Sequence, residues 1–452
     1  DVKAILENHD VFEVPFGPEM KALAGEITFG LGLDDEEHHR QRELMQKIAE
    51  PGDIDAVLAN VRRTTKGLIS DSNGRIDLMK GYITPLLTEA CLTYFGLDCD
   101  DPDAFAEWGV AISDTLFADP GGTRLEDRKL AFAGAKRLNS VIDWSIAKME
   151  RSPDPATLLG RMIGLRHSNE TLSDGTVLSE FLTDARIRAV LVGMVSGTVP
   201  TTTLAAGHAF EALLGQRGGL HMLREAASTD NRDRVREIVL EAARVKPVGF
   251  PGHFRYVNRD FTLTGEGATG HSFKKGDTVM VCTMSALSDP DFLDSPYAFR
   301  PGRIVDPAFM FGHGHHACLG RHLATEIMTE AFLQLFRLDN IRPKSRWQMM
   351  RTMGPFPYSY PMLFDPKSAP DGQSMMTIAV PLDAGQAPKV AARLRDDLGN
   401  PAKGEISNAF ENTGVIHTAS MTVVELMSGE ERKPTLLIEL NADGTPQSIL
   451  KS

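Results

Sequence analysis

Apolar residues recur at three- and four-residue spacing along most of the first half of the chain, which is the period of amphipathic helices. The spacing predicts helices over residues 1–9, 35–50, 53–65, 75–96, 101–117, 127–150 and 155–166. Residues 11–34 mix apolar side chains with Pro and Gly, and we expect a loop there. After a break at 171–175, a longer apolar segment predicts one long helix over 178–215, interrupted at Gly197 and Pro200.

The pattern changes after a further predicted helix over 231–245. Short alternating runs separated by Gly turns predict strands over 253–283. Residues 284–317 are expected to be mostly irregular, and a helix is predicted from Cys318 to about Leu335. This part of the chain is therefore expected to be mainly α with small β-sheets.

A composition shift at 364–374, which reads FDPKSAPDGQS, predicts a linker. Beyond it the pattern predicts strand, helix, strand and strand over 375–382, 387–398, 415–426 and 435–440. Such a βαββ segment leaves a sheet with an exposed edge, so we expect a partial, ferredoxin-like α+β domain. The predicted domains are 1–366 and 367–452, the second of unknown function.

Composition narrows the class of protein. A length of 452 residues with 42% hydrophobic and 24% charged residues is ordinary for a globular protein with a large and a smaller domain. The net charge of -13 argues against nucleic acid as the main partner. We expect no membrane span, because no stretch looks long and apolar enough, and a cytoplasmic location. The four cysteines contain no CxxC pair, which fits a reducing compartment.

One cysteine has unusual neighbours. Residues 311–320 read Phe-Gly-His-Gly-His-His-Ala-Cys-Leu-Gly and precede a predicted helix. A thiolate rather than a thiol binds iron, and a helix N-terminus lowers the pKa of a cysteine through its dipole and free N–H groups. The glycines permit a tight turn and a close approach of the backbone to a flat macrocycle. A haem iron held by the thiolate of Cys318 would explain these features.

The alternatives are a polar, histidine-rich loop without a ligand and, by residue type, a zinc site built from the loop's histidines and cysteine. The candidate ligands are His313, His315, His316 and Cys318. Zinc does not explain the glycines or the apolar helix that follows. The string resembles the haem-binding signature of the cytochrome P450 family at each fixed position, including Phe311, Gly312, Gly320 and the later Ala324. The resemblance covers residues 1 to about 366 and implies the cytochrome P450 fold, with haem b (iron protoporphyrin IX) as cofactor and with the family's first elements missing.

The resemblance also implies roles for residues outside the loop. A Glu-x-x-Arg pair at Glu241 and Arg244 would form a structural triad with Arg303, which lies in a Phe-x-Pro-x-Arg segment. Cations are expected to hold the haem propionates, and the family pattern places them at His38, Arg42, Arg255 and His316.

The long helix departs from the family pattern. Members place an acid and then a threonine after a glycine, to organise protons for dioxygen activation. An ungapped match puts Val199 and Pro200 at these two positions, and neither relays a proton. A one-residue shift would instead leave Thr198 or Thr201 in the working position. Residues expected to line the oxygen pocket are Gly197, Thr198, Pro200, Thr201 and Thr202. The expected substrate wall comprises Phe16, Met20, Ile27, Phe29, Val248 and Phe250.

Three functions follow as hypotheses. The first is a monooxygenase that inserts oxygen into an apolar small-molecule or lipid substrate, with electrons from a ferredoxin or reductase. The second is a peroxygenase or fatty-acid hydroperoxide isomerase, whose substrate supplies the O–O bond and needs no proton relay. The third is a non-catalytic haem-binding module.

Overall fold

A computed structural model describes residues 1–119, 122–249, 252–264, 270–303, 308–344, 349–365, 373–398, 416–428 and 431–443. The chain divides into two compact units. Unit 1 comprises Asp1–Asp71, Ile76–Arg337 and Pro343–Met362. Unit 2 comprises Ser72–Arg75, Leu338–Arg342 and Leu363–Ser452.

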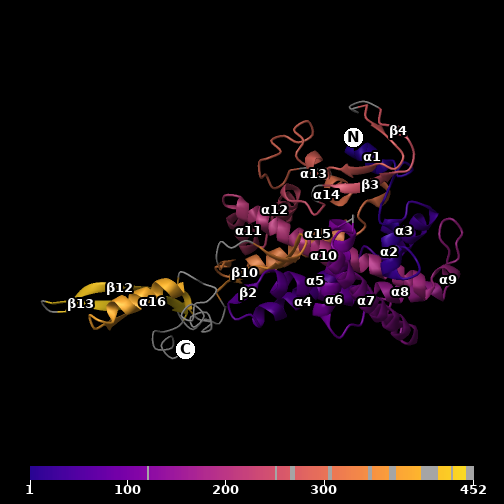
Figure 1. Ribbon diagram of the computed structural model, residues 1–452. Coiled ribbons are helices and arrows are strands. Elements are labelled where there is room, and N and C mark those ends of the chain that lie inside the picture. The colour runs from indigo at the N-terminus through magenta and orange to yellow at the C-terminus, as the bar shows by residue number, and fades with distance from the viewer. Residues whose placement is uncertain are drawn as a thin grey trace. The chain divides into compact units, whose positions relative to one another are not determined.

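Unit 1 is mainly helical, as the apolar spacing predicts (Figure 1). Its α-helices are α1 (Val2–Glu7), α2 (Gly17–Ala24), α3 (Glu36–Ile48), α4 (Asp53–Ser70), α5 (Thr84–Phe95), α6 (Pro102–Ser113), α7 (Leu125–Arg151), α8 (Leu158–Arg166), α9 (Leu178–Phe181), α10 (Asp184–Gly215), α11 (Gly219–Ser228), α12 (Arg232–Val245), α13 (Thr283–Ala286), α14 (Ala308–Phe311) and α15 (Arg321–Phe336). Short 3-10 or π turns are η1 (Gly30–Gly32), η2 (Met79–Ile83), η3 (Asp114–Ala118) and η4 (Gly314–His316).

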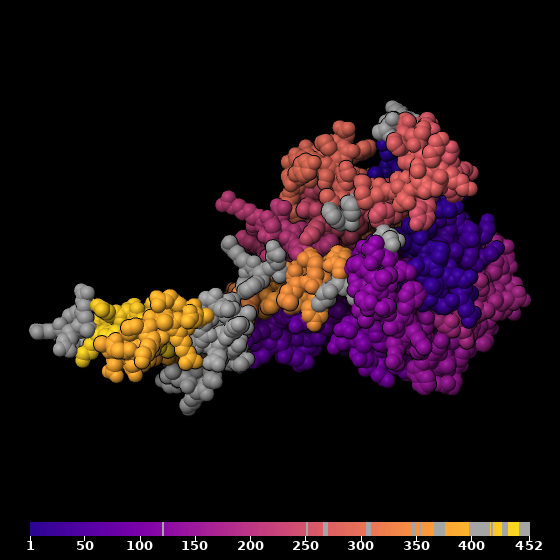
Figure 2. Space-filling model, viewed as in Figure 1, coloured from indigo at the N-terminus to yellow at the C-terminus, as the bar shows by residue number. Residues whose placement is uncertain are grey.

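Four small sheets accompany these helices. Their strands are β1 (Phe12–Glu13), β3 (His253–Val257) and β6 (Thr278–Val281) in the order β1-β3-β6; β4 (Phe261–Thr262) with β5 (Ser272–Phe273); β8 (Met350–Met353) with β9 (Phe356–Ser359); and β2 (Arg75–Asp77), β10 (Pro361–Leu363) and β7 (Arg342–Pro343) in the order β2-β10-β7. The first sheet joins the N-terminal residues to the segment before the cysteine loop, with Phe12 opposite Val257. Side chains of α1 and β1 pack with those of β3 and β6 in one apolar cluster. Figure 2 shows the N-terminal segment and the segment of β3 to β6 on adjoining parts of one face.

Helix α10 runs through the middle of unit 1 (Figure 1). By length and composition it could cross a membrane, but 67% of its most apolar window is buried inside the protein. The prediction that no stretch reaches that length was therefore wrong. The extensive burial is what a central core helix of a folded domain also shows.

The predicted interruption of the long helix lies in a different place from the observed one. The chain is helical through Gly197 and Pro200, and the break falls earlier, between α9 and α10. Thr183 starts α10, because its hydroxyl oxygen accepts a hydrogen bond from the N–H of Arg186.

Three helical segments also differ from the prediction. Helix α2 lies inside the predicted loop, α11 was not predicted, and the segment predicted as one helix over 75–96 holds β2, η2 and α5. The helix after the cysteine begins at Arg321, with Gly320 as its N-cap, rather than at the cysteine itself.

Unit 2 contains the strand, helix, strand and strand that the pattern predicts. They are β11 (Gln373–Pro381), α16 (Ala387–Leu398), β12 (Ile416–Ser428) and β13 (Glu431–Asp443). The antiparallel sheet order is β11-β13-β12, so β11 and β12 are parallel to each other with β13 between them. Apolar side chains gather on one face around Leu440 and Ala442. The predicted linker lies mostly at 366–372, which is outside the described residues.

Candidate haem-thiolate site

The cysteine loop adopts a tight conformation that two glycines allow. Gly312 and Gly314 have φ angles of 74° and 65°, a region that L side chains rarely occupy. A Cβ on Gly314 would lie 2.9 Å from the carbonyl oxygen of Leu6, so a side chain there would also strike α1. The loop closes where the N–H of Cys318 donates to the carbonyl oxygen of Phe311 at 2.7 Å.

The sulfur of Cys318 lies at the start of α15. The N–H groups of Gly320 and Arg321 hydrogen-bond to it, and the guanidinium of Arg42 acts on it electrostatically. Burial nevertheless raises the pKa of the Cys318 thiol above its ordinary value, against the lowering effect of those groups. We expected the helix N-terminus to lower this pKa, and its N–H groups do act in that direction, but burial outweighs them. A bound metal would deprotonate the coordinating thiol.

Cys318 is exposed to solvent, although enough protein surrounds it for burial to affect its pKa. We give the exposure more weight for ligation, because a sulfur must be reachable to bind a metal. Gly320 keeps the approach open, since a Cβ there would lie 3.9 Å from the sulfur. The N–H of Ala324 donates to the carbonyl oxygen of Gly320 at 2.8 Å and continues the helix.

The structure brings the four predicted propionate-binding residues together. The rings of His38 and His316 lie 4.7 Å apart, and the charge of Arg42 acts on both. Arg255 is only 7% exposed, and its charge also acts on His316. Among the described residues, Asp34 is the carboxylate that meets this group, through a 2.7 Å contact between its Oδ1 and Nε2 of His316.

These two arginines and two histidines fit a ligand that carries two carboxylates. Arg42 makes no hydrogen bond or ion pair within the part of the chain that the structure describes, and Arg255 donates only to the carbonyl oxygen of Phe254. Nδ1 of His38 and Nδ1 of His316 are buried and have no hydrogen-bond partner there. Buried polar groups are normally paired, and the propionates of a haem would supply the missing acceptors. The residues present therefore fit the cofactor.

The histidines of this group are neutral near physiological pH. Burial, followed by the neighbouring charges of His316, His315 and Arg42, lowers the pKa of His38 to about 3. Burial likewise lowers the pKa of His315 to about 4. A neutral imidazole still donates one hydrogen bond, which is what a propionate oxygen requires.

A structural triad of Glu241, Arg244 and Arg303 holds the segment that leads to the cysteine loop. Glu241 and Arg244 are each 1% exposed and form two hydrogen bonds, of 2.8 and 2.9 Å. Nε of Arg303 lies 3.2 Å from Oε1 of Glu241. Its other nitrogens donate to the carbonyl oxygens of Asp294 and Ala298. The triad thus ties α12 to the irregular segment that precedes the cysteine loop.

One face of α10 is uncovered and carries two of the predicted hydroxyl groups. Gly197 is exposed, and a Cβ built on it would meet nothing within 4 Å among the described residues. Thr198 and Thr201 are half-buried on the same face, and Oγ1 of Thr201 donates to the carbonyl oxygen of Gly197. The family resemblance places the distal side of the haem at this face.

Val199 and Pro200 lie off that face and are buried. The ring of Pro200 would lie 3.7 Å from a Cβ on Gly109 of α6, so it packs between helices. Pro200 and Thr202, which we expected in the oxygen site, therefore lie away from the open face, and Thr202 is 5% exposed. An ungapped match counts positions along the chain, whereas the open face depends on positions around the helix.

The expected substrate wall is only partly assembled. Met20 and Phe29 are buried, and Phe29 packs so closely on Gly193 that a Cβ there would lie 2.5 Å from its ring. Phe16 meets Phe117 edge-on at 5.4 Å, which joins the loop before α2 to η3. Ile27 and Val248 are half-buried, and Phe250 lies outside the described residues.

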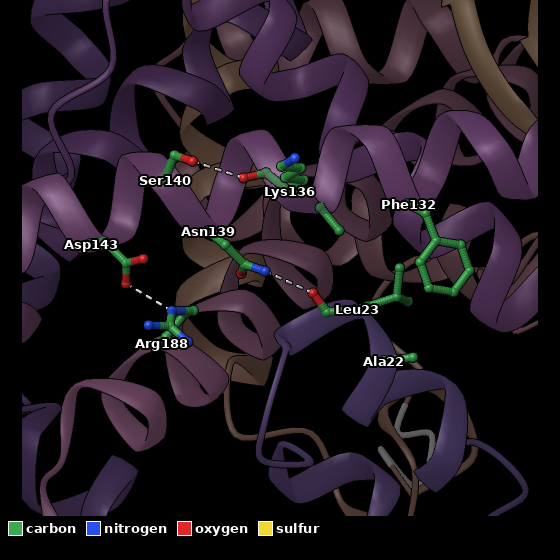
Figure 3. A pocket seen from close by; sticks show the side chains of 9 residues that line it. Ala22, Leu23, Phe132, Lys136, Asn139, Ser140, Asp143 and Arg188 are labelled. Atoms are coloured by element: carbon green, nitrogen blue, oxygen red, sulfur yellow. Dashed lines mark hydrogen bonds and ion pairs between the residues drawn. The ribbon is translucent and has the colours of Figure 1, made fainter.

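A separate surface hollow of about 320 Å³ contains none of the predicted site residues (Figure 3). It is lined by Ala22, Leu23, Phe132, Ala135, Lys136, Asn139, Ser140, Asp143 and Arg188. Arg188 pairs with Asp143 at 2.7 Å, and Nδ2 of Asn139 donates to the carbonyl oxygen of Leu23. The polar side chains of this hollow are therefore largely hydrogen-bonded or paired with neighbouring groups.

An accessible cysteine sulfur with two backbone N–H partners, beside the guanidinium of Arg42 and a group of imidazoles with buried nitrogens, is the arrangement expected of a haem-thiolate protein. Comparisons with known proteins agree with this class. A family model described as Cytochrome P450 matches residues 132–361, just over half of the chain. The chain therefore belongs to the cytochrome P450 family.

The individual relatives have low sequence identity to this chain but match it over much of its length. Erythromycin C-12 hydroxylase of Saccharopolyspora erythraea is 27% identical over 65% of this chain and 68% of its own. Polyketide biosynthesis cytochrome P450 PksS of Bacillus subtilis is 24% identical over 72% and 73%. The crystal structure of CalO2 superimposes with a TM-score of 0.68 at 21% identity, covering 81% of this chain and 89% of that one. The chain is a cytochrome P450-type oxidoreductase of the monooxygenase class, with haem b as its cofactor.

Proposed function

We propose that this protein inserts one oxygen atom into an apolar small-molecule or lipid substrate in the cytoplasm, with electrons from a ferredoxin or reductase. The observation that carries the proposal is the arrangement around Cys318, where an accessible sulfur lies beside Arg42 and near buried imidazole nitrogens that have no hydrogen-bond partner among the described residues. Haem, when bound, supplies the iron at which dioxygen is activated. The chain's own residues hold the cofactor, tune its electron density and manage protons.

In this proposal each side chain has a separate task. The thiolate of Cys318 would hold the haem iron and donate electron density to it, and the two N–H groups on its sulfur would limit that donation. Arg42 and Arg255 would neutralise the propionates, while His38 and His316 would orient them through ring N–H groups. Because its proton is directed at the carbonyl of Gly197, the hydroxyl oxygen of Thr201 presents its lone pairs to water or substrate.

The proton relay separates this function from hydroperoxide chemistry. The reason to favour a peroxygenase or hydroperoxide isomerase was that Val199 and Pro200 seemed to replace the relay. Thr198 and Thr201 on the open face support a hydroxyl in the relay, while the acid position of the family pattern still holds Val199 and no carboxylate. We therefore propose that Thr201 holds the working hydroxyl and that Thr198 lies one turn before it.

Spectroscopy and turnover test the proposal. The ferrous carbonyl complex of the wild type should show the red-shifted band of a thiolate ligand, and Cys318→Ser should lose that band while retaining its helical circular dichroism. Turnover should require dioxygen and an electron donor. Rapid consumption of a lipid hydroperoxide without reductant would support the second function instead, and no turnover under either condition would leave only a haem-binding module.

We also propose that residues 367–452 form a domain separate from the haem domain, 1–366. Support comes from the division of the chain into two units and from the separate apolar cluster on the β11-β13-β12 sheet. Limited proteolysis should release a haem-bearing fragment that ends close to residue 366. Cleavage that instead scatters through both units with loss of haem would contradict a two-domain organisation.

A further inference from the structure

Five histidines lie in ring contact beside the cysteine loop, and we call them the histidine cluster. They are His9, His38, His39, His315 and His316. His315 lies at the centre, stacked on His9 at 4.0 Å and on His38 at 3.6 Å between ring centroids. The haem-binding signature leaves its position free, so the family pattern assigns no role to this ring.

His315 resembles its two neighbours in having an unsatisfied nitrogen. Nε2 of His315 is buried and has no hydrogen-bond partner in the described ranges, as is also true of Nδ1 in His38 and His316. One ring nitrogen from each of the three lies within 4.8 Å of the others. A single small ligand can therefore reach all three rings.

The charge around the cluster decides which ligand fits. Arg42 and Arg255 contribute two positive charges, and Asp34 contributes one negative charge that is already bound to His316 and to the N–H of Val14. A divalent cation would add to this positive excess, whereas a carboxylate would neutralise it. Three imidazoles can bind zinc, but the surrounding guanidinium groups oppose it.

We propose that His315 is a third imidazole donor to the haem propionates, in addition to His38 and His316. Its stacking between His9 and His38 fixes the ring plane, so little rotational freedom is lost when the N–H meets a carboxylate oxygen. The inference rests on the proposed function, because it needs the haem to lie with its propionates beside this cluster.

The rate at which haem leaves the full-length protein measures this contact without reference to activity. Transfer of haem to excess apomyoglobin should be about tenfold faster for His315→Ala than for the wild type, as expected for the loss of a hydrogen bond to a charged group. His315→Gln keeps an N–H donor and should recover part of the loss. His322→Ala removes an exposed histidine of α15 outside the cluster and should stay within about twofold.

Haem dimethyl ester separates a propionate contact from a merely structural role. The ester lacks the carboxylates, so His315→Ala should change its release by less than about twofold. Equal acceleration with haem and with its ester would show that His315 only supports the loop, and would overturn the inference. An unchanged release of native haem from His315→Ala would overturn it as well.

Zinc titration tests the rival occupant. The haem-loaded protein should bind no stoichiometric zinc at the cluster. One equivalent of tightly bound zinc that is lost in His315→Ala, with haem release unchanged, would assign the cluster to a metal and overturn the inference. A thiolate-type ferrous carbonyl spectrum in every variant keeps the proposed function intact, so the two failures are distinguishable.

Discussion

The carbonyl of Ser196 should depend on a hydroxyl from another helix for its hydrogen bond. Pro200 has no N–H, so it cannot close the helix turn on the carbonyl four residues before it. The structure supplies a substitute donor, since Oγ of Ser113 in α6 donates to the oxygen of Ser196 at 2.7 Å. Both serines are buried, at 0% and 1% exposure, so water does not readily replace that donor. Ser113→Ala should therefore leave a buried carbonyl unsatisfied.

The expected loss of stability in Ser113→Ala follows from this unsatisfied carbonyl. Leaving a buried acceptor without its donor costs about 1–3 kcal/mol, more than the net value of an ordinary hydrogen bond. Pro200→Ala restores a backbone N–H at the right position, so Ser113→Ala should cost less than about 0.5 kcal/mol in that background. The expected coupling free energy between the two sites is about 1–2 kcal/mol.

Urea unfolding of the haem-loaded protein, followed at the haem band, reports on unit 1 and suits this double-mutant cycle. Ser140→Ala is the matched control. Its hydroxyl also donates to a helix carbonyl, that of Lys136 at 3.0 Å, but on the exposed side of α7. This control should change the free energy of unfolding by no more than about 0.5 kcal/mol. Equal costs of Ser113→Ala with and without Pro200 would refute the reasoning.

Three further outcomes are expected. Glu241→Gln breaks a buried ion pair and should destabilise the protein by about 3–5 kcal/mol, because it leaves Arg244 uncompensated; thermal unfolding measures this. Gly314→Ala should accelerate haem loss and should destabilise the protein more than Gly175→Ala does. Gly175 also has a positive φ, but a Cβ there would meet nothing within 4 Å among the described residues. Equal effects of the two substitutions would exclude the predicted clash at Gly314. Burial alone would raise the pKa of Asp53, but its hydrogen bonds lower it overall. Its stabilisation is present above pH 4 and lost as pH falls through the depressed pKa, so the stability gap between wild type and Asp53→Asn should narrow below pH 4.

Local backbone chemistry made the cysteine loop predictable. Gly312 and Gly314 are needed for their own φ angles, and Cys318 needs a helix start directly after it. Such requirements act within a few residues, so they leave a readable pattern. The strand and helix pattern of unit 2 was predictable for the same reason, because alternation and three- to four-residue spacing are local properties.

The intact course of α10 through Pro200 was not predictable in that way. Pro200 lacks the N–H that would bond to the carbonyl of Ser196, and the donor that replaces it is Ser113, which lies 83 residues from Ser196 in sequence. No pattern around Pro200 reveals this donor. The short strands β8, β9 and β10 were also missed, since strands of three or four residues are too short for alternation to stand out.

The loop that carries Cys318 contacts the N-terminal segment, residues 6–9, through three consecutive residues. Nε2 of His313 meets Oε1 of Glu7, Gly314 lies against the Leu6 backbone, and His315 stacks on His9. The first of these contacts joins positions 306 residues apart. These contacts can therefore form only after the ribosome has synthesised the cysteine loop, so the cofactor pocket is completed late in synthesis, through contacts of high sequence separation.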